Sequence, residues 1–436
     1  MRSKRSEKKR HENILIKLTI NVTRSNKPCG ILQVLDVKIL LIFQNIVYDI
    51  KKHLIFASSF KRKKHESTLK IYMFDLQAYM SNNISNMMLT GYKNMLRNPR
   101  EARFMLKMQQ TFKKSERLRQ KTAEAEGFQV PPFLISSISN SCNLQCNGCY
   151  ARKNGIADNP GASTRATLTA DQWKEIFEEA ASIGINFSLL VGGEPMMRRD
   201  ILEKVAEVKD MIFPVFTNGT LISPVTIDFF RKNLNMVPVI SLEGDMLQTD
   251  SRRGKGVYER VLRSMSMLQE DDIFFGVSIT VTSENLHHVT SDDFVGNLNQ
   301  LGCKLIFYVE YVPIEDDTAH LALSEQQLEE QDHINDHLRE LFPGIIFLSF
   351  PGDEKYMEGC LAAGRGFFHI GPDGAAEPCP FSPFSDSNVV TLGLKGALKS
   401  PLFRKLRDVR LVGGEMGGGC TLYEHRHEVE QLLRQA

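Results

Sequence analysis

Short apolar segments alternate with amphipathic helical patterns between residues 133 and 312, and this alternation constrains the fold of the 436-residue chain more than any other feature. The pattern predicts strands at 133–139, 186–191, 212–216, 236–242, 275–281 and 305–312. Three of the helical patterns open with capping residues, Thr169 with Gln172, Asp200 with Glu203 and Ser324 with Gln327. Strands that alternate with helices form a parallel sheet. We therefore predict an α/β fold, a partial (β/α)6 TIM-like barrel, whose ligand sites gather at the carboxyl ends of the strands.

Three cysteines follow the first predicted strand. Cys142, Cys146 and Cys149 have the spacing C-x3-C-x2-C, and Tyr150 comes directly after them. A cubane iron–sulfur cluster normally takes one thiolate on each of its four irons. Three thiolates would leave the fourth iron open to a small-molecule ligand, and an open metal position is typical of catalytic sites.

Zinc and disulfides are the alternatives for these cysteines. A structural zinc site usually shows a second C-x2-C or H-x3–5-H pair, and none lies near Cys149. The chain has 8 cysteines in 436 residues and no signal-peptide pattern, which disfavours a disulfide framework. The polar residues Asn143, Gln145 and Asn147 between the cysteines disfavour chance clustering in a core.

Further signals follow the next three predicted strands. Gly192-Gly193-Glu194-Pro195 follows the second strand, Thr217-Asn218-Gly219 the third, and Ser241-Leu242-Glu243-Gly244 lies at the end of the fourth. Glycines at a strand end let the backbone approach a ligand closely. The alternative for Gly192 and Gly193 is a strand-to-helix turn that needs positive φ. Together with the cysteine motif, these three segments therefore place four candidate ligand-binding segments on one face of the predicted barrel.

The cysteine motif with its aromatic neighbour, followed by GGEP, resembles the radical S-adenosylmethionine (radical SAM) superfamily. The resemblance implies that Cys142, Cys146 and Cys149 hold a [4Fe–4S] cluster, whose fourth iron binds the amino and carboxylate groups of S-adenosylmethionine (SAM). One electron then cleaves SAM to methionine and a 5′-deoxyadenosyl radical, which takes a hydrogen atom from the substrate.

The same resemblance implies roles for other residues. Gly192, Gly193, Glu194 and Pro195 would receive the SAM amino group, and Tyr150 would belong to the cofactor site. The SLEG segment with residues 250–254 resembles the S-x-D-G…D-x-x-R-G pattern of peptide-modifying members, with Glu243 in place of the usual Asp. Ser241 and Arg253 would then contact the ribose or carboxylate of SAM. The alternative for Arg253 is a solvated loop arginine.

A second cysteine set lies in the last ninety residues. Cys360, Cys379 and Cys420 surround a predicted hairpin with strands at 367–370 and 375–378. This arrangement resembles the SPASM and Twitch extensions of the superfamily, which bind auxiliary [4Fe–4S] clusters. Three cysteines in place of seven imply a Twitch-like version with one such cluster. Its fourth ligand stays open among substrate, water and the candidates Glu424, His425 and His427, which equally suit a solvated helix over 424–433. Cys303 is expected to be a buried small hydrophobe, and Cys29 has no partner at a useful spacing.

These patterns divide the chain into four parts. We expect an N-terminal extension at 1–72, poorly ordered or a start-site artefact, and a helical basic lead-in at 73–129 that packs outside the barrel or lies on a membrane surface. The barrel would occupy 130–345 and the auxiliary-cluster domain 346–436. The apolar stretch at 31–47 is broken by Asp36 and Lys38, so we expect no transmembrane segment.

The sequence therefore predicts a cytoplasmic radical SAM enzyme of oxidoreductase or maturase type. Hydrophobic residues are 42% and charged residues 24%, which suits a globular enzyme, and the net charge of +2 does not suggest a nucleic-acid partner. The expected substrate is a peptide or a small-molecule precursor in cofactor maturation, with ferredoxin or flavodoxin as electron donor. A cyclase of the molybdopterin-precursor type is one alternative, but such enzymes usually carry a C-x2-C pair in the second domain and end in Gly-Gly. A non-catalytic iron–sulfur carrier is another, and it would need no SAM pocket.

Overall fold

The computed structural model describes residues 99–157, 167–413 and 420–435. The predicted extension at 1–72, the first part of the helical lead-in and Cys29 lie outside these residues. Within the described ranges, no helix is both long enough and apolar enough to cross a membrane.

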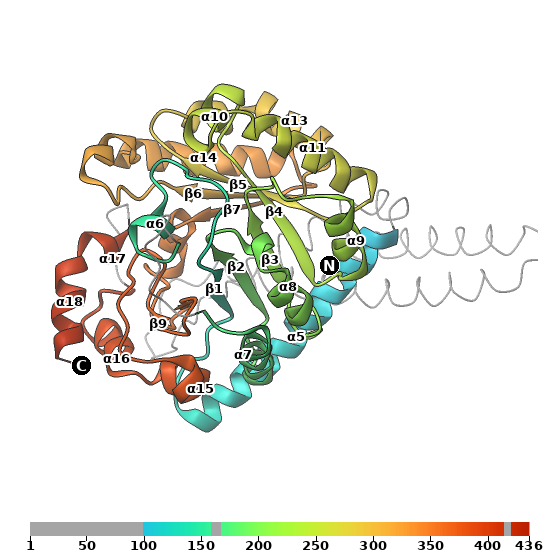
Figure 1. The fold of residues 1–436 in the computed structure, drawn as a ribbon. Helices are drawn as coiled ribbons and strands as arrows, with labels where there is room; N and C mark the ends of the chain where they lie inside the picture. Colours follow the sequence, from blue (N-terminus) through green and yellow to red (C-terminus); the bar gives the residue numbers. More distant parts are fainter. Residues whose placement is uncertain (1–98, 158–166, 414–419, 436) are drawn as a thin grey trace, which may run out of the picture. The chain divides into compact units, whose positions relative to one another are not determined.

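Seven parallel strands form the centre of the fold (Figure 1). They are β1 (Phe133–Ser139), β2 (Phe187–Gly192), β3 (Phe213–Thr217), β4 (Met236–Leu242), β5 (Gly276–Val281), β6 (Leu305–Glu310) and β7 (Ile346–Phe350). They pair in sequence order from β1 to β7, each parallel to the next. The six predicted strands are present, and β7 is an addition. Its short apolar run does not by itself distinguish a strand from a buried helical segment.

Helices follow the strands along the chain, as the alternation predicted. The longer ones are α7 (Ala170–Ile183), α8 (Arg199–Val205), α9 (Pro224–Lys232), α10 (Met246–Arg253), α11 (Val257–Glu270), α13 (Asp292–Gln300) and α14 (Glu325–Leu341). Short turns of helix lie at α6 (Tyr150–Lys153), η1 (Pro195–Met197), α12 (Leu286–Val289), η2 (Asp316–Leu321) and η3 (Gly352–Met357). The capping boxes predicted at Thr169 and Ser324 are confirmed. The cap predicted at Asp200 is wrong, because α8 begins one residue earlier and the Asp200 carboxylate pairs with the Arg198 side chain.

The helix α5 (Pro99–Glu126) covers the amino-terminal ends of the strands. Its side chains Phe104, Met105, Met108 and Phe112 are buried. The Phe104 ring lies 4.6 Å from that of Phe274, just before β5, and the Phe112 ring lies 6.3 Å from that of Phe187, which begins β2. The basic lead-in predicted from the sequence thus ends in a helix that closes the floor of the barrel.

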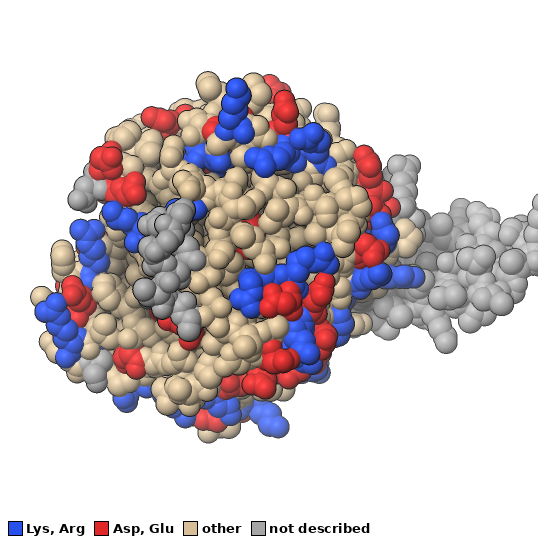
Figure 2. All heavy atoms as spheres, in the orientation of Figure 1, with Lys and Arg blue, Asp and Glu red and all other residues tan. Residues whose placement is uncertain are grey.

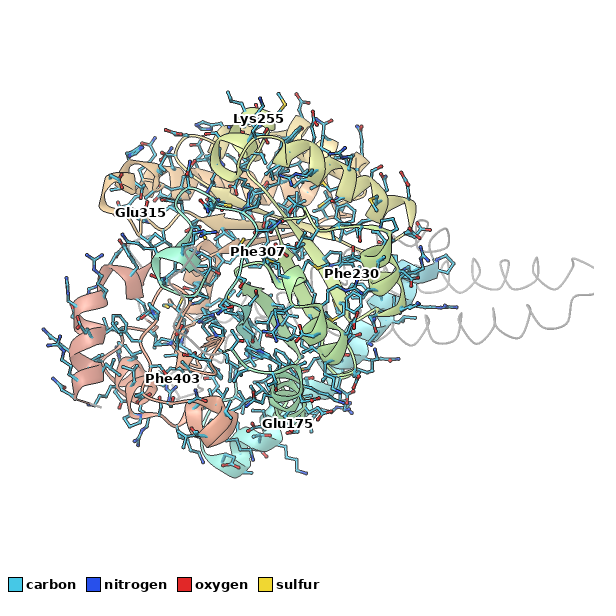
Figure 3. All side chains as sticks on the ribbon, viewed as in Figure 1. Glu175, Phe230, Lys255, Phe307, Glu315 and Phe403 are labelled. Atoms are coloured by element: carbon cyan, nitrogen blue, oxygen red, sulfur yellow. The ribbon has the colours of Figure 1, made fainter. Side chains whose placement is uncertain are left out.

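The C-terminal segment joins the same sheet beside β1. The strand β8 (His369–Ile370) pairs parallel with β1 and antiparallel with β9 (Ala376–Glu377), which forms the predicted hairpin. The helices α15 (Val389–Leu398), α16 (Pro401–Asp408), α17 (Thr421–Glu424) and α18 (Arg426–Arg434) follow. Phe403 of α16, labelled in Figure 3, packs its ring 5.6 Å from that of Phe368 next to the hairpin.

Buried polar side chains tie this hairpin to the barrel. His369 Nε2 lies 2.8 Å from Ser137 Oγ on β1, and His369 Nδ1 lies 2.7 Å from Glu377 Oε2 on β9. All three side chains are fully buried. On the displayed face of the molecule, basic and acidic side chains are interspersed around a largely uncharged centre (Figure 2). This distribution agrees with the small net charge of +2.

Candidate active site at the carboxyl ends of the strands

A cavity of about 330 Å³ runs through the barrel interior, between α5 and the loops at the carboxyl ends of the strands. Its floor is apolar and includes Phe104 and Phe112 of α5. Farther up, the lining includes Phe307 of β6, labelled in Figure 3, whose ring meets that of Phe216 edge-on at 5.4 Å. The predicted site residues that line the cavity are Cys142, Cys146, Cys149, Tyr150, Gly192, Gly193, Glu194, Ser241 and Arg253. Residues separated by more than a hundred positions are thus brought to one cavity.

The three cysteines of the first motif lie on the loop between β1 and α6 and are half-buried. Burial raises the pKa of the Cys142 and Cys146 thiols, and the thiol of Cys149 lies close enough to raise both further. Among the described residues, no three His, Cys, Asp or Glu side chains converge closely enough to hold a single metal ion. A cubane cluster distributes its thiolates over different irons, so three thiols on one cavity-lining loop suit it without such convergence.

Gly192 and Gly193 let the end of β2 approach the cysteine loop. Gly192 has φ of +128°, and a Cβ there would overlap the carbonyl oxygen of Ser139. A Cβ on Gly193 would overlap the backbone of Ser141, one residue before Cys142. The backbone N–H of Gly193 donates to the Ser139 carbonyl at 2.7 Å, and that of Glu194 donates to the Ser141 carbonyl at 2.7 Å. The glycines thus serve a close approach of two backbones, as well as lining the cavity.

The carboxylate of Glu194 organises the ends of β2 and β3. Only 1% of Glu194 is exposed. It accepts hydrogen bonds from Thr217 Oγ1 at 2.7 Å and from the backbone N–H groups of Asn218 at 2.7 Å and Met196 at 2.9 Å. Burial raises the pKa of the Glu194 carboxyl above its ordinary value, and these hydrogen bonds offset part of that rise. Glu194 therefore fixes the GGEP segment against the Thr217–Gly219 turn.

The Thr217–Gly219 turn also holds the cysteine loop. Asn218 Nδ2 donates to Asn143 Oδ1 at 2.8 Å, and Asn143 Nδ2 donates to Thr220 Oγ1 at 2.9 Å. Asn143 stands directly after Cys142. The signals after β1, β2 and β3 thus form one hydrogen-bonded network.

Arg252 connects the Ser241–Gly244 segment at the end of β4 to the cysteine loop. Its Nη1 lies 2.6 Å from both Glu243 Oε1 and Thr280 Oγ1, and its Nε donates to the Asn147 carbonyl at 3.2 Å. The backbone N–H of Asn147 in turn donates to the Arg252 carbonyl at 2.9 Å. The sequence did not single out Arg252, because an arginine in a polar segment has no pattern that separates it from solvated neighbours.

Arg253 is largely buried and binds the same carboxylate. Its Nε donates to Glu243 Oε1 at 2.7 Å, and its side chain is 12% exposed. Glu243 Oε2 is buried and has no hydrogen-bond partner among the described residues. Arg253 is therefore no solvated loop arginine. It lines the cavity while Glu243 orients its guanidinium.

Tyr150 lies between the two cysteine sets. Its ring centroid is 5.1 Å from that of Phe381, which follows Cys379 by two residues and also lines the cavity. Burial raises the pKa of the Tyr150 hydroxyl, and Cys149 and Cys379 both lie near enough to raise it further. Asn154 Nδ2 also donates to the Pro380 carbonyl at 2.9 Å. The C-terminal cysteine segment therefore packs directly against the first cysteine loop.

Cys360, Cys379 and Cys420 come within electrostatic range of one another. Burial raises the pKa of all three thiols, that of Cys420 to about 12. Cys379 and Cys420 act on Cys360, Cys420 acts on Cys379, and the buried carboxylate of Glu354 acts on each. Of the fourth-ligand candidates, Glu424 and His427 are exposed, and His425 Nδ1 lies 2.9 Å from Glu428 Oε1. Cys303 is fully buried, as expected.

Sequence reasoning missed further polar residues of the cavity besides Arg252, among them Glu310, Tyr311, Asp353 and Glu354. Glu310 and Tyr311 stand at the end of β6, and the two others lie on η3 after β7. For Glu310 and Tyr311, the sequence signal was their position at the carboxyl end of a predicted strand. For Asp353 and Glu354 the sequence offered no such signal, because the preceding strand β7 was not predicted.

The family model of the radical SAM superfamily matches residues 136–295. The chain is 27% identical over 327 residues to an AdoMet-dependent heme synthase of Methanosarcina barkeri, a match covering 68% of this chain and 89% of that protein. It is 26% identical over 299 residues to the antilisterial bacteriocin subtilosin biosynthesis protein AlbA of Bacillus subtilis, covering 65% of this chain and 63% of that protein.

The fold is similar to that of Streptococcus suis SuiB. With SuiB bound to S-adenosylmethionine the TM-score is 0.56 at 18% identity, covering 70% of this chain and 76% of that one. With SuiB bound to the precursor peptide SuiA the TM-score is 0.55 at 16% identity, covering 88% and 85%. At these identities the similarity describes the fold, an α/β architecture with a mainly parallel sheet.

Proposed function

We propose that this chain, whose family match and relatives support membership of the radical SAM superfamily, reductively cleaves S-adenosylmethionine and abstracts a hydrogen atom from a peptide or a cofactor precursor. One observation carries the proposal. The three cysteines of the C-x3-C-x2-C loop, residues Gly192, Gly193 and Glu194 of the GGEP segment, Ser241 and Arg253 line a single cavity. No structural zinc site or disulfide framework needs that combination.

Each residue has a role in this proposal. Cys142, Cys146 and Cys149 would hold a [4Fe–4S] cluster with one open iron, and that cluster, when bound, would supply the electron for SAM cleavage. The backbone of Gly192 to Pro195 would receive the SAM amino group, with Glu194 holding the segment in place. Ser241 and Arg253 would contact the ribose or carboxylate of SAM, and Tyr150 would close the site beside the cysteine loop.

We further propose that Cys360, Cys379 and Cys420 hold one auxiliary [4Fe–4S] cluster in a Twitch-like domain. The burial of Cys360 and Cys379 and the charge interactions among the three thiols support this assignment. The packing of Phe381 on Tyr150 would place such a cluster beside the cavity. A reaction that oxidises the substrate needs an electron acceptor there, and a ferredoxin or flavodoxin would serve as the external donor.

Heme synthesis and the biosynthesis of the bacteriocin subtilosin are the functions that the names of these two relatives state. The molybdopterin-type cyclase is disfavoured because the C-terminal cysteines form no C-x2-C pair. A non-catalytic cluster carrier is disfavoured because it has no use for the glycine segment and for Arg253 at the same cavity.

Spectroscopy on anaerobically reconstituted protein tests the proposal. We expect about eight irons per chain, four for each cluster, and an EPR signal of the reduced protein that changes on addition of SAM. Cys379→Ala/Cys420→Ala should lose about four irons and keep the response to SAM. A parent protein whose reduced spectrum does not respond to SAM would refute the proposed function.

A further inference from the structure

The carboxylate of Glu354 lies among the three C-terminal cysteines. Glu354 stands on η3 after β7, lines the cavity and is 3% exposed. The thiol of Cys360 donates a hydrogen bond to this carboxylate. Burial raises the pKa of the Cys379 and Cys420 thiols, and the charge of Glu354 raises both further. One buried carboxylate therefore approaches thiols from three separate segments of the chain.

The loop after η3 fixes this carboxylate beside the Cys360 thiol. The backbone N–H of Leu361 donates to Glu354 Oε1 at 3.1 Å, and that of Gly359 donates to the Glu354 carbonyl at 3.1 Å. Arg365 Nη1 donates to the carbonyls of Gly359 at 2.8 Å and of Cys360 at 2.9 Å. The same tight loop thus sets the positions of the carboxylate and of the thiol.

The charge of this group of side chains is not balanced by a direct cation. The Glu354 carboxylate forms no ion pair with a described residue, and the guanidinium of Arg365, whose charge acts on it, donates to backbone carbonyls instead. Burial of a carboxylate without a counterion is unfavourable. Thiols also lose their protons when they bind metal, which adds negative charge at the same place. Irons among these four groups would supply the missing positive charge.

The candidates that the sequence suggested for a fourth ligand are less well placed. Glu424 and His427 are exposed, and His425 Nδ1 lies 2.9 Å from Glu428 Oε1. A cubane cluster held by three thiolates has one iron left for another ligand. Carboxylates are ligands of iron in proteins, as in sites that combine two histidines with one carboxylate.

We infer that the Glu354 carboxylate binds the fourth iron of the auxiliary cluster, beside Cys360, Cys379 and Cys420. The inference rests on the proposed function, since it completes the ligand set of the auxiliary cluster proposed there. It implies that this cluster has no iron open to substrate and serves electron transfer. Histidines in place of two cysteines raise the potential of Rieske centres, and an oxygen ligand should act in the same direction. A raised potential suits an acceptor of substrate electrons.

Mössbauer and EPR spectroscopy of the auxiliary cluster alone test the inference. The background is the anaerobically reconstituted Cys142→Ala/Cys146→Ala/Cys149→Ala protein, which lacks the ligands of the first cluster. We expect about four irons in this background, and in Glu354→Gln about three, with the EPR signal of an oxidised three-iron cluster. Glu354→Cys should restore about four irons and lower the reduction potential, because a thiolate replaces the oxygen ligand. Glu358→Gln, at an exposed position on the same loop, is the matched control and should keep about four irons with an unchanged spectrum.

Melting temperatures establish that the variants are folded, and Glu354→Cys decides alone if Glu354→Gln is not. An unchanged iron content and spectrum in Glu354→Gln would overturn the inference. So would a Glu354→Cys protein that lacks the fourth iron, or whose spectrum and potential equal those of the background. A background without iron would refute the auxiliary cluster and the inference together. SAM cleavage at the first cluster stands apart from all these outcomes, because the response of the parent protein's reduced spectrum to SAM measures it separately.

Discussion

Arg252 illustrates how much of the site depends on single side chains. One guanidinium contacts the Glu243 carboxylate, the Thr280 hydroxyl and the Asn147 carbonyl, so it connects β4, β5 and the cysteine loop. Its planar fork matches these three acceptors, which a lysine ammonium on a flexible stem does not reproduce. The residue therefore positions the loop without touching the proposed reacting atoms.

We predict that Arg252→Gln weakens SAM binding about tenfold, because a lost charge-assisted hydrogen bond costs about 1.5–3 kcal/mol and part of the loop contact remains. A SAM titration followed by EPR measures the effect. Arg199→Gln, which removes a half-exposed pair with Glu203, is the matched control and should bind SAM as the parent does. Equal SAM affinity in both variants would show that the loop is fixed without Arg252.

Glu310 gives a pH dependence with a definite sign. Its pKa is about 7 in the folded protein against 4.5 as the ordinary value. Between these values the unfolded chain has lost the proton that the folded protein keeps, so stability falls as pH rises through this window. Over the whole window the free energy of unfolding falls by about 3 kcal/mol, since a pKa difference of one unit corresponds to about 1.36 kcal/mol. Glutamine cannot ionise, so Glu310→Gln should gain several °C in melting temperature relative to the parent between pH 5.5 and pH 8. A constant difference across this range would contradict the assignment.

At the scale of elements, the site depends on strand ends that approach one another closely. The end of β2 lies so near the loop after β1 that Gly193 has no room for a side chain beside Ser141. We expect Gly193→Val to displace the cysteine loop, and therefore to lower both the iron bound by that loop and the affinity for SAM. Gly344→Ala is the control, because nothing lies within 4 Å of a Cβ there. Full iron content with weakened SAM binding would mean that Gly193 faces the ligand alone.

The β8–β9 hairpin depends on a buried histidine. His369 bridges Ser137 of β1 and Glu377 of β9, and none of the three is exposed. Leaving a buried hydrogen-bonding group without its partner costs about 1–3 kcal/mol for each group. We predict a loss of this size for His369→Ala in chemical denaturation, whereas His337→Ala, which removes an exposed pair with Asp292, should change stability by less than about 0.5 kcal/mol. Equal effects would show that the hairpin is held by its apolar contacts.

At the scale of the whole molecule, the sequence predicted the parts that follow from periodicity. Six strands, two capping boxes and four strand-end signals on one face could be identified, because a buried parallel strand and an amphipathic helix each impose a repeating pattern. The hydrogen bonds that join those signals could not be predicted. Asn143, Asn218 and Arg252 are ordinary polar residues until the fold brings them together.

The burial of two acidic residues was unpredictable for a related reason. Glu310 and Asp353 are charged residues of a kind that usually lies on the surface, and only the fold of β6, β7 and α14 buries them beside the cavity. The interaction of Cys360, Cys379 and Cys420 was predicted from resemblance alone, since 59 intervening positions carry no periodic signal. Long-range convergence of this kind is a property of the folded chain.

The most direct test of the central proposal is the formation of 5′-deoxyadenosine. Reconstituted, reduced protein is incubated with SAM, and the product is quantified by mass spectrometry beside the Cys142→Ala/Cys146→Ala/Cys149→Ala variant. We expect 5′-deoxyadenosine and methionine in equal amounts from the parent and neither from the variant, while Cys379→Ala/Cys420→Ala continues to form both. Product from the triple variant at the parent's rate, or none from a parent that holds its full iron, would contradict the assignment of the cysteine loop as a SAM-cleaving centre.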